Sequence, residues 1–304
     1  MKRSTRVGII GVVFGLGAIL AQDIIMKNLS AHYSVIQLIL VRSVFALLML
    51  SCLLPFISGS KVFQSNRMGL QILRGSLQFL SFSCYYIALK SMPILDLVTI
   101  FFSAPLIAVA LSVPILKEKV SMKHWIAISL GFVGALLMIG PKGLGFDQGI
   151  ALLALGAAIL YAGSIVATRV LGESDQGATT ALYTSIMYAV LAGISVSVME
   201  FIYPLLMSDS YSPSVEYWVT PTIQHIALLI VAGIAVCAAF LLLAHAYRQA
   251  PVSILAPWEY SALIWGGVFG YVFWNELPST VTIFGGSLIV SSGIYITRHS
   301  KLSD

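Results

Sequence analysis

The run from Pro251 to Glu276, PVSILAPWEYSALIWGGVFGYVFWNE, is apolar and carries one carboxylate, Glu259, well inside it. An earlier run, Pro93 to Glu118 (PILDLVTIFFSAPLIAVALSVPILKE), has the same spacing between its first proline and its last glutamate. The two runs lie 158 residues apart. The same offset relates the cation three residues before each proline, Lys90 and Arg248, and the alanine five residues before it, Ala88 and Ala246. Together with the prolines and the glutamates, these make four matching pairs at one offset, which indicates a duplicated chain.

The composition predicts a chain whose solvent is largely lipid. Of its 304 residues, 59% are hydrophobic and only 10% are charged, whereas a soluble domain carries about 25% charged residues. The net charge is +5, but the cations stand at the ends of apolar segments, so they do not indicate nucleic-acid binding. The three cysteines lie inside apolar runs without disulfide or metal-ligand spacing, so we expect no metal and no cofactor.

Ten apolar runs are long enough to cross a membrane as helices, which takes about 20 residues each. No run alternates between apolar and polar residues, so an all-α membrane protein is predicted rather than a barrel. Several linkers are only a few residues long, which makes sequential helices antiparallel. The expected spans are 7–26, 34–57, 69–89, 94–116, 123–140, 148–170, 178–204, 222–247, 252–274 and 279–297.

The cations in the loops predict the orientation. If the N-terminus is cytoplasmic, twelve Lys and Arg residues lie inside, and only Lys27, Lys90 and Lys142 lie outside. This excess places both termini in the cytoplasm. Each half, 1–147 and 148–304, holds five helices, so the second half enters the membrane from the opposite side to the first. Inverted repeats of this kind favour alternating access around a site near the midplane.

Glu259 is the main candidate for a functional charge, because it lies seven residues into the expected ninth span, roughly 10 Å from the inner surface. A charge at that depth costs a few kcal/mol. Two interpretations stay open: a carboxylate that recognises a cation or couples a proton, and a structural carboxylate that is paired or protonated. Ala262, Gly266 and Gly270 continue its helical face, and small residues permit close helix approach.

Asp23 and Arg42 are expected in the outer half of the membrane, near the ends of the first and second spans. They could line the outer part of a cavity. Alternatively, Asp23 pairs with Lys27 one helical turn away, and Arg42 fixes the second helix.

Aromatic side chains at membrane depth form a second group of candidates. They could stack on a planar or cationic ligand, or they could simply pack within the membrane. Phe101 is the counterpart of Glu259 at the repeat offset, so any negative charge at the centre comes from the second half. The candidates are Tyr86, Phe101, Tyr161, Trp258 and Tyr260.

Charged residues near the ends of the spans are expected to have structural roles. Arg74 and Arg169 should extend toward the cytoplasmic surface. Glu118 and Glu276, which end the fourth and ninth spans, should bond the start of the following helix.

Prolines and glycines mark expected irregularities within the spans. Pro105 and Pro257 interrupt the hydrogen-bond ladder, which produces either a moving bend or a static kink. Four glycines are expected at tight helix crossings, namely Gly11, Gly15, Gly131 and Gly134.

The two proline-led segments, each ended by Glu before a glycine-bearing helix, resemble the drug/metabolite transporter superfamily and its EamA-like ten-helix family. The resemblance is carried by ALKSMPILDLVTIFFSAPLIAV and AYRQAPVSILAPWEYSALIWGGVFGYVFWNE, and it covers nearly the whole chain. It implies a central cavity lined by helices 1, 3, 4, 6, 8 and 9. Such proteins move amino acids, amines, riboflavin, S-adenosylmethionine, nucleotide derivatives or drugs. The AQDIIMK end of the first helix is similar to members that take up S-adenosylmethionine or riboflavin.

The expected function is therefore secondary transport of a small metabolite across a bacterial inner membrane, with a proton or a counter-substrate as the coupling partner. The solute is expected to be amino-acid-like, an amine, or of the S-adenosylmethionine or riboflavin type. A broad-specificity metabolite or drug exporter of the same fold is the alternative. An integral membrane enzyme is disfavoured, because the five histidines are scattered. A monomer or weak homodimer is expected.

Overall fold

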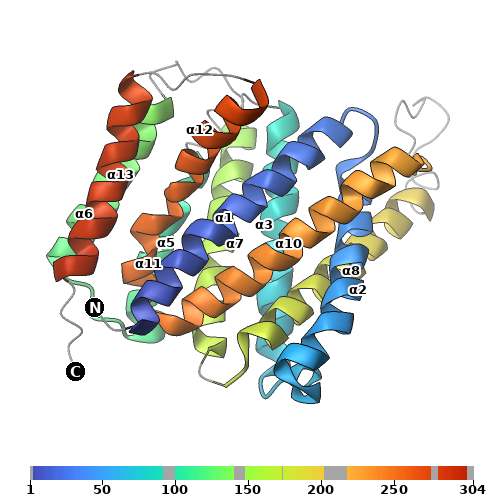
Figure 1. Cartoon of the computed structure of the whole chain (residues 1–304), viewed down its shortest axis with the longest axis horizontal. Coiled ribbons are helices and arrows are strands. Elements are labelled where there is room, and N and C mark those ends of the chain that lie inside the picture. The colour runs from blue at the N-terminus through green and yellow to red at the C-terminus, as the bar shows by residue number, and fades with distance from the viewer. Residues whose placement is uncertain are drawn as a thin grey trace.

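The computed structural model describes residues 3–91, 100–139, 148–172, 174–201, 218–274 and 280–299 as helices with short connections, without a strand in these ranges (Figure 1). The predicted all-α class is confirmed. The helices are α1 (Arg3–Leu29), α2 (Val35–Ser58), η1 (Ser60–Phe63, a 3₁₀ turn), α3 (Met68–Ser91), α5 (Ala104–Leu116), α6 (Met122–Ile139), α7 (Gln148–Leu171), α8 (Gly177–Phe201), α10 (Ile223–Gln249), α11 (Val252–Glu259), α12 (Ser261–Trp274) and α13 (Thr280–His299).

Several of these helices are suited to a membrane by length and composition. Within the described ranges, five reach the length and hydropathy of a span, and two shorter apolar helices accompany them. The protein is therefore a multi-pass membrane protein. The long apolar helices are Ser4–Met26, Val35–Phe56, Gly149–Leu171, Gly177–Val198 and Ile223–Gln249, and the shorter ones are Ala104–Leu116 and Ile283–Ser292.

The expected ninth span is not one continuous helix. It breaks at Tyr260 into α11 and α12, and the expected fourth span breaks at Phe102 and Ser103, just before α5. These breaks fall at corresponding positions, because Phe102 and Tyr260 are separated by the offset that relates the two sequence runs. Pro105 lies in the first turn of α5 and cannot donate a backbone hydrogen bond into the preceding turn, which accounts for the first break.

The main helix contacts join segments that are far apart in the sequence. α1 packs on α10, α3 on α7, α2 on α8 and α6 on α13. In Figure 1, α1 and α10 cross the middle of the molecule, and α13 covers α6 at one side. α1 begins and α13 ends at the same end of the bundle. Each pair thus joins a helix before residue 140 to one after residue 147.

The glycines predicted at crossings do lie against neighbouring helices. A Cβ atom at Gly11 would come within 2.9 Å of the Leu242 carbonyl oxygen, and one at Gly134 within 2.8 Å of the Gly285 carbonyl oxygen. A Cβ at Gly131 would lie 2.7 Å from the Tyr260 ring. These distances are shorter than side chains tolerate, so the α1–α10 and α6–α13 contacts require glycine at these positions.

We predict that Gly11→Ala lowers the stability of the protein in detergent by about 1–3 kcal/mol, because the added methyl group meets backbone rather than a movable side chain. The control is Gly156→Ala in α7, where a Cβ meets nothing within 4 Å and helix propensity favours alanine. Thermal unfolding of both variants measures the difference. Equal melting temperatures would show that the α1–α10 contact adjusts freely.

A polar network ties the connection between η1 and α3 to the turn between α7 and α8. The Asp175 carboxylate, 4% exposed, accepts hydrogen bonds from the Asn66 backbone N–H at 2.9 Å, Gln71 Nε2 at 2.8 Å and the Ser65 hydroxyl. Burial raises the pKa of Asp175, but the hydrogen bonds from Ser65, Gln71 and Asn66 outweigh it and leave the pKa below its usual value. The ionised form therefore stabilises this end of the bundle.

This lowered pKa predicts a stability contribution that depends on pH. The contribution is fully present above the unfolded-state pKa of about 4 and is lost as pH falls through the lower folded-state pKa. Asp175→Asn should therefore reduce the melting temperature at pH 7. The difference in melting temperature between the variant and wild type should disappear under strongly acidic conditions. The neighbouring exposed Gln176→Ala is the control, and its pH profile should match wild type. A gap for Asp175→Asn that is constant from pH 7 to pH 2 would contradict the assignment.

Candidate functional site

The two helix breaks border a cavity of about 260 Å³. Its wall combines the second half of α1, α3, residues 101–105, α7 and the region around the α11–α12 break. Two carboxylates, Asp23 and Glu259, line it, and Lys, Arg and His are absent from its described lining. The rest of the wall is mostly apolar, with five aromatic side chains: Phe82, Tyr85, Phe101, Phe102 and Tyr161.

Glu259 is the last residue of α11 and lies immediately before the break. It is 5% exposed and accepts hydrogen bonds from the Tyr161 hydroxyl at 3.2 Å and from the Tyr247 hydroxyl. In the part of the chain that the structure describes, it forms no ion pair. Two phenol donors orient the carboxylate without supplying a positive charge, so a cation in the cavity would be its first neutralising partner.

Asp23 lies on the α1 side of the cavity, and its carboxylate is hydrogen-bonded to residues that do not line the cavity. It accepts hydrogen bonds from the Tyr86 hydroxyl at 2.7 Å and from the Gln22 amide. The oxygen of the same amide accepts from Arg42 Nη1, so Arg42 reaches Asp23 only through Gln22. The Arg42 guanidinium, 2% exposed, lies 5.7 Å from the centroid of the Tyr188 ring.

The residues proposed from the sequence do not all lie at the cavity. Asp23, Phe101, Tyr161 and Glu259 meet at the cavity wall. Tyr86 and Arg42 lie behind Asp23. The side chain of Lys27, the alternative partner of Asp23, is outside the described side chains.

Tyr260 and Trp258 are not among the lining residues. Tyr260 is fully buried and its ring packs against Phe102 and Phe132 at centroid distances of 5.7 and 6.5 Å. Trp258 packs against the same core. Both side chains therefore support the wall from behind in this conformation.

Three contributors were not found from the sequence. Tyr247 bonds Glu259 from α10, Gln22 bridges Asp23 and Arg42, and Phe82 lines the cavity. A signal existed for Phe82, since Phe82, Tyr85 and Tyr86 occupy positions i, i+3 and i+4 and thus share one face of α3. Nothing in the local sequence indicates that Tyr247 faces Glu259, because the contact depends on how α10 turns back into α11.

Three structural predictions are wrong. Arg74 does not extend to the surface: it is 4% exposed and donates from Nε to the Thr168 hydroxyl at 2.8 Å and from Nη1 to Thr184. Gly266 does not mark a helix crossing, since a Cβ there meets nothing within 4 Å and the residue borders the cavity. Glu118 bonds the start of α11 rather than that of the following helix, α6. Glu276, its expected counterpart, is outside the described residues.

Comparison with known proteins reveals relatives that are described as transporters or exporters. The chain is 25% identical over 283 residues to an S-adenosylmethionine uptake transporter of Rickettsia bellii, covering 92% of this chain and 90% of that protein. It is 23% identical to a pseudopaline exporter of Pseudomonas aeruginosa, over 91% of each chain. It is 27% identical to a riboflavin transporter of Brucella anthropi, over 80% and 81% of the two chains.

A solved crystal structure shares the fold, with a TM-score of 0.74 over 97% of this chain and 96% of that one, at 18% identity. The names of the relatives point to a membrane transporter rather than an enzyme. More particularly, residues 6–140 match the EamA-like transporter family. The resemblance drawn from the sequence is thereby confirmed.

The adjacent glycines of α12 offer a direct test of the cavity. A Cβ at Gly266 or at Gly267 meets nothing within 4 Å, but only Gly266 borders the cavity. We predict that Gly266→Val weakens solute binding at least tenfold by occupying cavity space, whereas Gly267→Val leaves binding and folding close to wild type. Ligand-induced thermal shifts over a metabolite panel measure both. Equal loss of binding in the two variants would place the solute elsewhere.

Proposed function

We propose that the protein is a secondary transporter that moves small cationic metabolites across the bacterial inner membrane by alternating access. The observation that carries this proposal is the lining of the cavity. Two carboxylates on separate helices face an otherwise apolar, aromatic space without a lysine, arginine or histidine in its described lining. Such a site favours a solute with a positive charge and a flat or apolar body, because it supplies charge neutralisation and cation–π contact together.

The arrangement around Asp23 supports the same charge preference. Arg42 would neutralise Asp23 if the two side chains met, but Gln22 lies between them and takes the hydrogen bond from Arg42. The amide therefore keeps the internal cation one side chain away from the cavity. The Asp23 carboxylate remains open to a cation that enters from the cavity side.

The packing supports a two-fold relation between residues 1–147 and 148–304. If α1, α2, α3, α5 and α6 are matched with α7, α8, α10, α11–α12 and α13, the contact of α1 with α10 becomes that of α7 with α3. Likewise the contact of α5 with α7 becomes that of α11 and α12 with α1. Two inverted five-helix repeats that form ten spans, with both termini in the cytoplasm, account for these exchanges and for the cation distribution of the loops.

The relatives narrow the class of solutes to test. S-Adenosylmethionine combines a planar base with a sulfonium cation and an amine, so it meets both preferences of the cavity. Riboflavin has a planar ring without a positive charge, and it tests whether the aromatic wall suffices alone. The direction of movement follows the gradient of solute and coupling ion, so uptake and export are both compatible with this site.

The test is solute flux into proteoliposomes that contain wild type or Glu259→Gln. We predict that the variant loses at least tenfold in uptake of a cationic solute, because the amide retains the size of the side chain but not its charge. Binding should fall as well. The matched control is Glu200→Gln, the same change at a carboxylate near the end of α8, which should transport as wild type.

Three results would count against the proposal. Wild-type flux in Glu259→Gln would remove this carboxylate from recognition. Preferred transport of anionic solutes would contradict the charge of the cavity. Absence of flux for the whole panel in folded wild-type protein would argue against a carrier of such solutes.

A further inference from the structure

The end of α11 opposite Glu259 is held by a carboxylate from a distant part of the chain. Glu118 Oε1 accepts a hydrogen bond from the Val252 backbone N–H at 3.1 Å, and Oε2 accepts one from the Ser253 N–H at 3.3 Å. These amides begin α11 and have no partner within the helix. The negative charge of Glu118 also stabilises α11, because it faces the positive end of the helix dipole.

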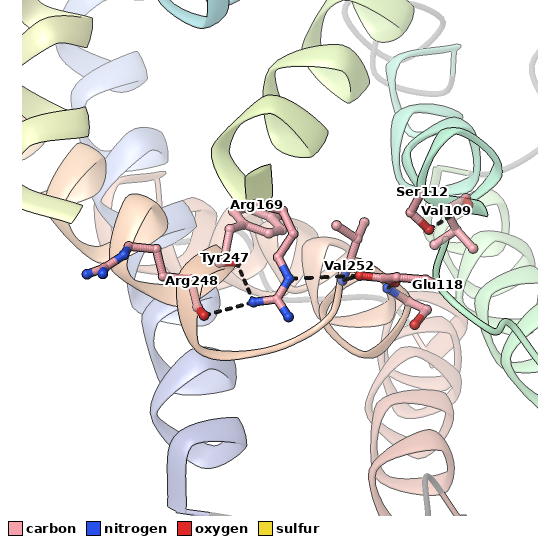
Figure 2. Close-up of polar contacts among 8 residues, drawn as sticks. Val109, Ser112, Glu118, Arg169, Tyr247, Arg248 and Val252 are labelled. Carbon is pink, nitrogen blue, oxygen red and sulfur yellow. Dashed lines mark hydrogen bonds and ion pairs between the residues drawn. The ribbon is translucent and has the colours of Figure 1, made fainter. Parts of the chain in front are cut away.

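Arg169, from the end of α7, joins the same contact. Its Nε lies 3.9 Å from Glu118 Oε1, and its Nη1 donates to the carbonyl oxygens of Arg248 at 2.8 Å and Tyr247 at 3.5 Å. Figure 2 shows the guanidinium between the α10–α11 connection and Glu118. The Glu118 side chain is 12% exposed and that of Arg169 30%, so the pair is partly shielded from solvent screening.

The backbone after α5 places Glu118 in this position. α5 ends at Leu116, and Lys117 adopts a left-handed conformation with φ of 54° while its N–H donates to the Ser112 carbonyl oxygen. A left-handed lysine is uncommon. The turn it makes ends the helix sharply and leaves the next residue, Glu118, against the first turn of α11.

α11 connects this contact to the cavity. The helix has only eight residues, of which all but Trp258 are buried, and Glu259 is its last residue. Tyr247 joins both ends, since its hydroxyl donates to Glu259 and its carbonyl oxygen accepts from Arg169. Only about two helical turns therefore separate the Glu118 contact at Val252 from Glu259 at the cavity.

We propose that Glu118, Arg169 and the backbone of residues 247–253 form an inner latch, which closes the cavity on the side of the α5–α6 connection. In the closed state, α11 fills the space between the cavity and this end of the bundle. Release of Glu118 frees the start of α11 to move, which opens a route on this side and carries Glu259 with it. The inference rests on the proposed alternating access and adds the residues that hold one of its two gates.

The test measures access to the cavity rather than flux. The reporter is Gly266→Cys in a background in which Cys52, Cys84 and Cys237 are replaced by serine. A membrane-impermeant maleimide is applied from the side of the α5–α6 connection, in vesicles of known orientation and without solute. We expect Glu118→Gln to raise the labelling rate from that side about tenfold, which corresponds to about 1.4 kcal/mol of lost latch energy. Lys119→Gln, which removes an exposed charge from the same connection, should leave the rate unchanged.

A double-variant cycle separates the latch from a general loosening of the fold. If Glu118 and Arg169 act on one contact, Glu118→Gln combined with Arg169→Gln should label no faster than the quicker single variant. Additive rates would overturn the latch, as would equal labelling of Glu118→Gln and Lys119→Gln. If Glu118→Gln folds poorly, Arg169→Gln alone answers the question, because loss of either partner should open the same side.

The latch and the proposed function fail in different ways. Unchanged labelling in Glu118→Gln together with normal solute flux would remove the latch and leave the transporter. Faster labelling from the latch side, with no flux of any solute in wild type, would support the latch and remove the transport proposal.

Discussion

The backbone of a membrane helix must satisfy its own hydrogen bonds, because the lipid core offers no other partner. A break in such a helix is tolerated where it is surrounded by protein or borders a polar space. Here two breaks occur, at Phe102 with Ser103 and at Tyr260, and both border one cavity. The position of the cavity, the exposure of Glu259 to it and the short length of α11 all follow from these interruptions.

The electrostatics of the cavity depend on two carboxylates that have hydrogen-bond donors but no contacting cation in the described structure. Glu259 has two tyrosine hydroxyls and Asp23 has a tyrosine hydroxyl and an amide, so each is oriented but neither is neutralised by a contacting cation in the described structure. The buried arginines are placed elsewhere: Arg42 behind Gln22, and Arg74 among the hydroxyls of Thr168 and Thr184. Under the proposed function, this separation leaves the neutralisation of the carboxylates to the solute.

The sequence predicted the all-α class because apolar length is a local property. Glu259 and Phe101, which the sequence relates by an offset of 158 residues, both line the cavity. The sequence predicted irregularities at Pro105 and Pro257 but not where the helices end and restart, since the runs 94–116 and 252–274 read as continuous apolar segments. It also misjudged Glu118 and Arg74. Their partners, the start of α11 and the threonines of α7 and α8, lie over 90 residues away, and such contacts are set by tertiary packing. Tyr247 was missed for the same reason.

The pairing of α1 with α10, α2 with α8, α3 with α7 and α6 with α13 has a consequence for biogenesis. The helices made first find their main partners only after the ribosome has produced the later ones. The early part of the polypeptide must therefore wait in the bilayer with its glycine-lined faces against lipid or an insertion factor. Premature termination would leave a fragment that spans the membrane yet has little to fold upon, which makes such fragments natural targets for quality-control proteases.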